Sequence, residues 1–311
     1  MRTLRAGGRA ALGLDLIPSP FTDAVGSICD REFVRHHLKG VQAIIHAATL
    51  HKPHVATHPN QDFVETNLTG TLILLEEAMT AGVQTFVFTS TTSAFGSALT
   101  PAPGAPAAWI TEDVVPVPRN IYGVTKLAAE NLCELFHRQQ RLATVVLRTS
   151  RFFPEADDDA TIRDLSAVPN AQANEMLNRR VDLEDVVRAH LLAVERAPEI
   201  GFGRYIISAS TPFTRADLGE LRTDAPAVVH RLFPDCAAAF AARGWRLFPR
   251  IDRVYVNDQA RANLGWRPKY DFPHVLACLR TGKDFRSPLA REVGSKGYHA
   301  TKFEHGPYPV A

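Results

Sequence analysis

The sequence predicts an α/β fold, a doubly wound parallel sheet with helices on both faces and a smaller C-terminal domain. Near-continuous apolar segments alternate, through the first two-thirds of the chain, with amphipathic segments of roughly 10–20 residues. After Ser150 this alternation weakens, and from Thr211 onward proline, aromatic residues and short helical patterns dominate. We therefore expect one domain over residues 1–150, to which 181–210 return, and a smaller domain with a tail over 151–180 and 211–311.

The elements follow from periodicity and from capping residues. Arg2–Ala6 looks like a last helical turn before Gly7 and Gly8, and Leu99–Arg119 and the acidic segment 155–159 are predicted loops. The tail 295–311 has no periodicity and is expected to be poorly ordered. The predicted strands are Ala10–Leu16, Val41–Ala47, Thr85–Ser90, Thr144–Arg148 and Arg204–Ser208, and the predicted helices are Asp30–Lys39 with Asp30 as N-cap, Gln61–Ala81 ending at Gly82, Ile121–Gln140 and Asp182–Arg196.

Composition excludes several classes of protein. Lys and Arg number 35 against 33 Asp and Glu, and no run of five like charges occurs, so nucleic acid is not an expected partner. The apolar stretches are far shorter than the ~20 residues that a membrane span needs. The four cysteines form no C-x-x-C pair, which favours reduced thiols in a cytoplasmic protein.

The strongest chemical signal is the pair Tyr122 and Lys126 at the start of a predicted helix. Residues four apart share a helix face, and an ammonium beside a phenol stabilises the phenolate and lowers a pKa that starts near ~10. Such a phenol can act as a general acid and base near neutral pH. Tyr-x-x-x-Lys is a short pattern that also occurs by chance, so its context matters.

A cluster of hydroxyl side chains over Phe88–Gly96 supplies that context. It follows the strand Thr85–Ser90, and ligands of open α/β folds bind at the carboxyl ends of strands. One of these hydroxyls would hold a substrate oxygen. The alternative is a Ser/Thr-rich turn that caps its own backbone.

Together these segments resemble the extended short-chain dehydrogenase/reductase family, also called the NAD-dependent epimerase/dehydratase family. The resemblance extends from about Arg9 to Phe272 and implies a Rossmann-like sheet with a smaller C-terminal substrate domain. The segments that carry it, in the family's order, are Asp15, Ile45–Ala48, Asn67–Thr71, Phe88–Gly96, Tyr122 with Lys126, Leu147–Arg148, Val181–Val186 and Leu264–Pro268.

The resemblance implies NAD as cofactor and a role for each matching residue. Tyr122 is the expected general acid and base, Lys126 tunes it and holds the nicotinamide ribose, and Thr91 matches the catalytic Ser/Thr. Asp15 would accept hydrogen bonds from the adenosine ribose and repel a 2′-phosphate, which favours NAD over NADP. The other implied cofactor contacts are Ser27 (where the family has Asp), Ile28, Ala47, Ala48, Thr49, Asn67 and Ser90.

The implied reaction is hydride transfer at a secondary hydroxyl of a sugar-like or nucleotide-sugar substrate, by an oxidoreductase or an epimerase. Dehydratases of the family have Thr-Asp-Glu where this chain has Thr91, Thr92 and Ser93, so sugar dehydration is disfavoured. Thr92, Ser93 and Arg151 are the expected substrate contacts. Arg151 either binds an anionic substrate or pairs with the acidic segment 155–159.

One family feature has no match in the sequence. The family begins with a strand and a G-x-x-G-x-x-G turn that binds the cofactor pyrophosphate, whereas Gly7 and Gly8 precede the second strand. We therefore expect the first strand to be missing, Met1 to be a misassigned start codon, and the 311-residue chain to bind NAD poorly. The alternative function is a non-catalytic, ligand-sensing or truncated inactive member of the same fold.

Histidines and leucines complete the predictions. His46 is interpreted as a buried core residue, and His51, His54 and His58 are not expected to bind metal, because no cysteine or carboxylate accompanies them. The helices 61–81 and 121–140 carry more leucines than one sheet face needs, and the family resemblance implies that these helices form a homodimer; the alternative is that the same leucines all face the sheet. These leucines are Leu68, Leu72, Leu75, Leu127, Leu132 and Leu135.

Overall fold

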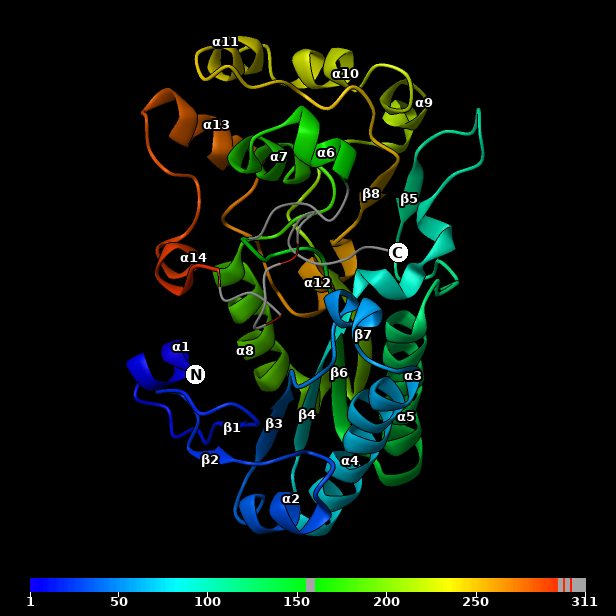
Figure 1. The fold of residues 1–311 in the computed structure, drawn as a ribbon, viewed down its shortest axis with the longest axis vertical. Coiled ribbons are helices and arrows are strands. Elements are labelled where there is room, and N and C mark those ends of the chain that lie inside the picture. Colours follow the sequence, from blue (N-terminus) through cyan, green and yellow to red (C-terminus); the bar gives the residue numbers. More distant parts are fainter. Residues whose placement is uncertain (155–159, 296–298, 300–302, 304–311) are drawn as a thin grey trace. The chain divides into compact units, whose positions relative to one another are not determined.

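The computed structural model describes residues 1–154, 160–295, 299 and 303; the predicted loop 155–159 and most of the predicted tail lie outside the described residues. The chain has an α/β fold that divides into two compact units (Figure 1). Unit 1 comprises Met1–Ser90, Ile121–Val146 and Ala193–Gly203, and unit 2 comprises Thr91–Asn120, Leu147–Leu192 and Arg204–Ala311.

The main sheet has four strands in the order β3-β4-β6-β7. β3 pairs with β4 in parallel, from Ala43 opposite Thr85 to His46 opposite Phe88. The pair β1 and β2 forms a separate two-stranded parallel sheet, and so does the pair β5 and β8. The strands are β1 (Leu14–Asp15), β2 (Ala24–Val25), β3 (Ala43–His46), β4 (Thr85–Thr91), β5 (Ala108–Ile110), β6 (Ala143–Thr149), β7 (Phe202–Ile207) and β8 (Arg253–Tyr255).

Two strand predictions need correction. The strand expected over Ala10–Leu16 is limited to β1, because Gly13 bonds instead to Asp23: its N–H donates to the Asp23 carboxylate at 2.7 Å and its carbonyl accepts from the Asp23 N–H. The loop expected over Leu99–Arg119 contains β5, three residues that are too few to show an alternating pattern.

Two helix ends of unit 1 lie where the capping residues indicate. Asp30 accepts a 3.1 Å hydrogen bond from the N–H of Phe33 and caps α2 (Arg31–His37). Gly82, with a φ of 75°, ends α4 (Gly70–Ala81) in the left-handed conformation that favours glycine. Besides the π-helix η2 (Val64–Thr69), the other helices that include unit 1 residues are α1 (Arg2–Ala6), η1 (Lys52–Ala56), α3 (Asn60–Phe63), α5 (Ile121–Gln140) and α8 (Leu183–Ile200).

The predicted helix Gln61–Ala81 is not a regular α-helix. Between α3 and α4 the backbone forms a π-helix, η2 (Val64–Thr69), which contains Asn67. A π-helical segment widens the turn and is often found at functional sites. The leucines expected on the outer face are partly exposed except Leu75, which was wrongly assigned, because it lies fully buried in the core.

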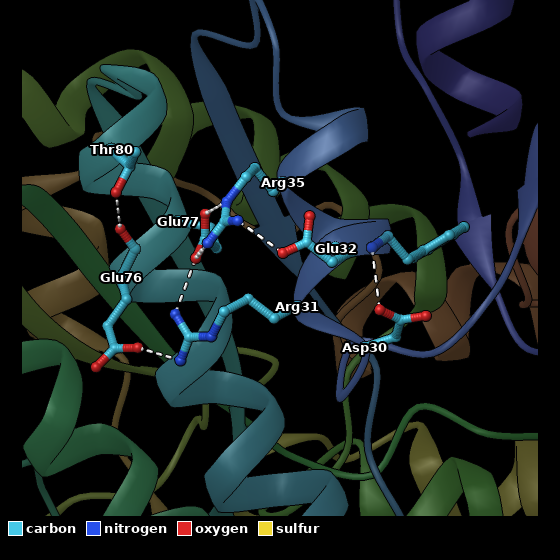
Figure 2. Close-up of polar contacts among 8 residues, drawn as sticks. Asp30, Arg31, Glu32, Arg35, Glu76, Glu77 and Thr80 are labelled. Atoms are coloured by element: carbon cyan, nitrogen blue, oxygen red, sulfur yellow. Dashed lines mark hydrogen bonds and ion pairs between the residues drawn. The ribbon is translucent and has the colours of Figure 1, made fainter.

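The core of unit 1 lies where α2, α4 and α5 pack on β3, β4 and β6. Its centre includes Leu75 and Phe86, both with no exposed surface. An ion-pair cluster also joins α2 to α4 (Figure 2). Arg31 and Arg35 both bond to Glu77, at 2.8 Å and 2.9 Å, and the Glu77 side chain is only 3% exposed.

The core of unit 2 is separate and contains Phe240 and Phe272, which pack on one another with ring centroids 6.2 Å apart. No helix among the described residues is both long enough and apolar enough to cross a membrane. The helices that lie wholly in unit 2 are η3 (Thr92–Phe95), η4 (Ser97–Leu99), α6 (Ala160–Leu165), α7 (Val168–Glu175), η5 (Arg215–Asp217), α9 (Leu218–Leu221), α10 (Ala225–Leu232), α11 (Cys236–Ala241), α12 (Asp258–Asn263), α13 (Phe272–Arg280) and α14 (Pro288–Val293).

Candidate active site

Tyr122 and Lys126 lie in the first two turns of α5 and are both buried, with 5% and 2% of their surface exposed. Nζ of Lys126 donates a 2.6 Å hydrogen bond to the carbonyl oxygen of Thr89 and lies 4.1 Å from the centre of the Phe88 ring. Burial lowers the pKa of Lys126 to about 7, although the nearby Glu130 carboxylate favours the charged form. The pair therefore places a phenol and a titratable amine on one helix face.

Two histidines share this environment. His51 lies with its ring centroid 5.9 Å from that of Tyr122, and His46 is buried on β3. Burial, with a smaller effect of the Lys126 charge, lowers the pKa of each to about 3, so both are neutral near pH 7. Nε2 of His46 lies 2.9 Å from the Thr71 hydroxyl, which agrees with its interpretation as a satisfied core residue.

Asn67, inside the π-helix, fixes the segment that follows β3. Its Oδ1 accepts hydrogen bonds from the Thr49 hydroxyl and the Leu50 N–H, both at 2.8 Å. Its Nδ2 donates to the Leu50 carbonyl and to the Thr125 hydroxyl, both at 3.1 Å. Thr125 lies between Tyr122 and Lys126, so one buried amide links the loop after β3 to the helix of the candidate site.

Ser90 and Glu130 form a second buried contact under this helix. The Ser90 hydroxyl donates a 2.5 Å hydrogen bond to Oε1 of Glu130, and the two residues are 2% and 0% exposed. Glu130 lies one turn after Lys126 on the same face. Glu130 was not among the predicted site residues, although its spacing of four residues from Lys126 could have indicated it.

The residues expected to contact the adenosine half of the cofactor also lie in unit 1. Asp15 is exposed at the end of β1, where Oδ1 accepts from the Ile17 N–H at 3.0 Å. Ile28 packs against Gly70 of α4. A Cβ added at Gly70 would lie only 2.6 Å from Cδ1 of Ile28. The Ser27 hydroxyl accepts from the Cys29 N–H at 3.1 Å, which fixes the turn beside it.

These residues fit a dinucleotide at its two ends. An exposed carboxylate suits the two adjacent hydroxyls of a ribose, and a buried amine such as that of Lys126 suits the nicotinamide half. Ala47 and Ala48 are exposed directly after β3, so their small side chains leave room for a planar ligand there.

The remaining predicted residues belong to unit 2. Thr91 is 8% exposed, and its hydroxyl accepts a 3.0 Å hydrogen bond from the Ser93 N–H and thereby caps η3, as the alternative interpretation of this segment expected. Thr92 is 6% exposed and Ser93 is half-buried.

Arg151 lies in a cluster of cations around one carboxylate. Its Nε is 3.9 Å from Oε1 of the buried Glu175, which also pairs with Arg179 at 2.8 Å and Arg180 at 2.7 Å. Three guanidinium groups therefore lie around this one buried carboxylate. The expected alternative partner of Arg151, the acidic segment 155–159, lies outside the described residues.

Parallel strands with intervening helices and a buried Tyr–Lys pair are typical of oxidoreductases that use a nicotinamide cofactor. The family model described as "NAD dependent epimerase/dehydratase family" matches residues 14–207, and the chain belongs to this family, whose cofactor is NAD.

Characterised relatives are distant. The chain is 28% identical over 262 residues to a UDP-glucose 4-epimerase of Rhizobium leguminosarum bv. trifolii, covering 75% of each chain. It is 29% identical over 273 residues to a dTDP-glucose 4,6-dehydratase of Streptomyces antibioticus, covering 81% of this chain and 73% of the relative. Other alignments are partial: the match spans 28% of the protein y4nG of Sinorhizobium fredii and 42% of a UDP-glucose 4-epimerase of Erwinia amylovora.

Solved structures share the fold. A short-chain dehydrogenase/reductase superfamily protein from Agrobacterium tumefaciens with bound NAD matches with a TM-score of 0.61 and 23% identity, covering 94% of each chain. The UDP-glucose 4-epimerase of Thermotoga maritima with UDP-glucose matches with a TM-score of 0.59 and 21% identity, covering 90% of this chain and 94% of the epimerase.

Proposed function

We propose that this protein is an NAD-dependent oxidoreductase or epimerase that acts on a secondary hydroxyl of a sugar-like or nucleotide-sugar substrate. The observation that carries the proposal is the buried pair of Tyr122 and Lys126 on one face of α5, with the Lys126 amine held by the Thr89 carbonyl. The family membership and the names of the relatives support the substrate class.

Each side chain of the proposed site has a defined task. When bound, NAD accepts the hydride from the carbon that bears the reacting hydroxyl. Tyr122 takes the proton of that hydroxyl and returns it in the reverse direction, which is general acid and base catalysis. The Lys126 amine favours the phenolate when it is charged and binds the ribose of the nicotinamide half. Asp15 selects NAD over NADP because its carboxylate repels a 2′-phosphate.

The proposed contacts of unit 2 concern the substrate. The Thr91 hydroxyl holds the reacting oxygen of the substrate by a hydrogen bond. Thr92 and Ser93 bind neighbouring hydroxyls, and Arg151 binds an anionic group of the substrate. The position of Arg151 in a cluster of guanidinium groups around Glu175 supports its assignment. In this proposal residues 151–180 and 211–311 determine the substrate, while 1–150 and 181–210 bind the cofactor.

Substrate turnover tests the proposal directly. We expect the purified chain, incubated with NAD and with UDP-glucose, UDP-galactose or glucose 6-phosphate, to produce either NADH or the epimer of one of them. A substrate deuterated at the reacting carbon should transfer its deuterium to the cofactor. NAD binding without turnover of any of these probes contradicts the proposal and favours a ligand-sensing role.

We further propose a cytoplasmic homodimer. The four cysteines are free thiols, as expected in a reducing compartment. The partly exposed leucines of the helical segments 61–81 and 121–140, such as Leu68 and Leu135, support pairing through these helices.

A further inference from the structure

His51 is the N-cap residue of the short helix η1, and its ring lies beside the Tyr122 ring. The two rings have centroids 5.9 Å apart and planes tilted by 39°. Both residues belong to unit 1, and His51 is only partly covered from solvent, whereas Tyr122 is buried. An imidazole therefore lies in contact range of the phenol proposed as general acid and base.

A reciprocal capping arrangement fixes which ring nitrogen of His51 carries a proton. The His51 side chain accepts a hydrogen bond from the His54 backbone N–H, while the His51 backbone N–H donates to Nδ1 of His54 at 2.9 Å. A ring nitrogen that accepts a hydrogen bond has no proton, so in the neutral imidazole the other nitrogen must be the N–H donor. The fold thus gives His51 one defined tautomer.

The surroundings of His51 also keep it neutral. Burial has the largest effect on its pKa, followed by the charge of Lys126 from α5 and that of His54 from η1, and together they lower it to about 3. A neutral imidazole of fixed tautomer is a hydrogen-bond donor whose state does not change over the physiological pH range.

We propose that His51 is a further catalytic residue, which donates a hydrogen bond from its second ring nitrogen to the substrate oxygen on which Tyr122 acts. This inference rests on the proposed function of Tyr122. A fixed neutral donor stabilises the negative charge that develops on that oxygen when its proton leaves, and needs no rearrangement to do so. The competing explanation is purely structural, since the same side chain caps η1.

A matched pair of substitutions separates the two explanations. Asn is among the best N-cap residues, but its short side chain cannot reach as far as the second ring nitrogen of histidine. Gln reaches further and ends in an amide N–H, but it is a poorer cap. If His51 donates to the substrate, His51→Asn should lower kcat/KM by roughly 10- to 100-fold, mostly through kcat, and His51→Gln should stay within a few-fold of the wild type.

The assay uses NAD with UDP-glucose, UDP-galactose and glucose 6-phosphate, and includes Tyr122→Phe as reference. A His51→Asn variant as active as the wild type, or a His51→Gln variant that is the more impaired, overturns the role of His51 and leaves that of Tyr122 intact. Full activity of Tyr122→Phe, or a wild-type chain inactive on all three probes, overturns the proposed function and this inference with it.

The protonation state has a readout that needs no substrate. In the chain with 15N-labelled histidine, we expect the two His51 ring nitrogens to keep the shifts of one neutral tautomer from about pH 5 to about pH 8. A His51 that becomes protonated in this range, or that shows both tautomers in exchange, contradicts the inference. The His51→Asn spectrum assigns the signal.

Discussion

Lys126 donates a 2.6 Å hydrogen bond to the backbone carbonyl oxygen of Thr89, so the second turn of α5 is tied to the last residues of β4. The hydrogen bond from Ser90 to Glu130 ties the same strand to the next turn of the helix. The Ser90–Glu130 contact is buried and the Lys126–Thr89 contact is partly buried, so both are shielded from competing water. Tyr122 therefore stands on a helix whose position along β4 is fixed at two successive turns.

Removing the Tyr122 phenol oxygen should abolish most of the activity. Because Tyr122→Phe keeps the ring and its packing, we expect turnover to fall by roughly 10²–10⁴-fold while NAD affinity hardly changes. Steady-state kinetics and calorimetric titration with NAD measure the two effects. Tyr270→Phe is the matched control, since its hydroxyl donates to Glu184 at 3.2 Å. Comparable turnover of the two variants contradicts the assignment.

Replacing Lys126 should change how stability depends on pH. Its pKa is lowered from 10.5 to about 7 in the folded chain, so between these values the unfolded chain binds more protons. The free energy of unfolding then rises with pH in this window, by up to roughly 1.4 kcal/mol per pH unit. Below about pH 7 the folded chain bears the full cost of burying the charged Lys126 amine. In Lys126→Met this slope should disappear, as urea unfolding at several pH values can measure. An unchanged slope argues against a lowered pKa.

Asp15 should decide the choice between the two nicotinamide dinucleotides. We expect the native chain to bind NAD more tightly than NADP, because the Asp15 carboxylate repels the 2′-phosphate. In Asp15→Ala the ratio of the two dissociation constants should move toward one, and in Asp15→Asn it should move less far, because the amide still bonds to a free hydroxyl. Tighter binding of NADP by the native chain rules the assignment out.

Glu77 and Glu76 offer a test of buried against exposed ion pairs. Hydrogen bonds from Arg35 and Arg31 hold the pKa of Glu77 below its ordinary value of 4.5. Its contribution to stability is therefore present above that value and is lost as the pH falls through the lowered pKa. We expect Glu77→Gln to lower the melting temperature clearly at pH 7. On acidification, the melting temperature of this variant should fall less than that of the wild type.

The control for this prediction is Glu76→Gln. The Glu76 side chain is 41% exposed and pairs with Arg31, so its loss should cost only about 0–1 kcal/mol. Calorimetry at pH 7 and near pH 4 compares the two variants with the wild type. Equal melting temperatures of Glu76→Gln and Glu77→Gln at pH 7 contradict the buried role of Glu77.

Light scattering tests the proposed assembly. We expect a homodimer at micromolar concentration, and Leu135→Glu, which places a charge on the partly exposed face of α5, should give a monomer. Leu75→Glu is not a useful probe of the interface, since a charge in the fully buried core unfolds the chain. A wild-type monomer contradicts the prediction.

The sequence could predict those parts of the fold that depend on residues close together in the chain. Asp30 as a cap, Gly82 as a helix end and the start of α5 at Ile121 depend on residues adjacent in the chain, and they were confirmed. The parts that could not be predicted depend on pairing between strands that are far apart in the chain. The strand β5 exists because its three residues pair with β8, more than 140 residues further along the chain.

The candidate site divides in the same way. Tyr122 and Lys126 share a helix face by spacing alone, so their burial side by side was predictable. The contact of His51 with Tyr122 depends on how the segment after β3 turns back, which Asn67 fixes through hydrogen bonds over 17 and 18 residues. No periodicity in the sequence encodes such a contact.

The π-helix that contains Asn67 determines what the deletion of one residue from this segment would do. A π-turn is equivalent to one residue inserted into an α-helix, so deletion of a single residue between 64 and 69 would leave a continuous α-helix and an undisturbed scaffold. The same deletion would rotate Asn67 away from Leu50 and Thr125 and release the loop that holds His51. Among natural variants of this fold, the length of this one segment would thus separate chains that keep the loop in place from chains that keep only the architecture.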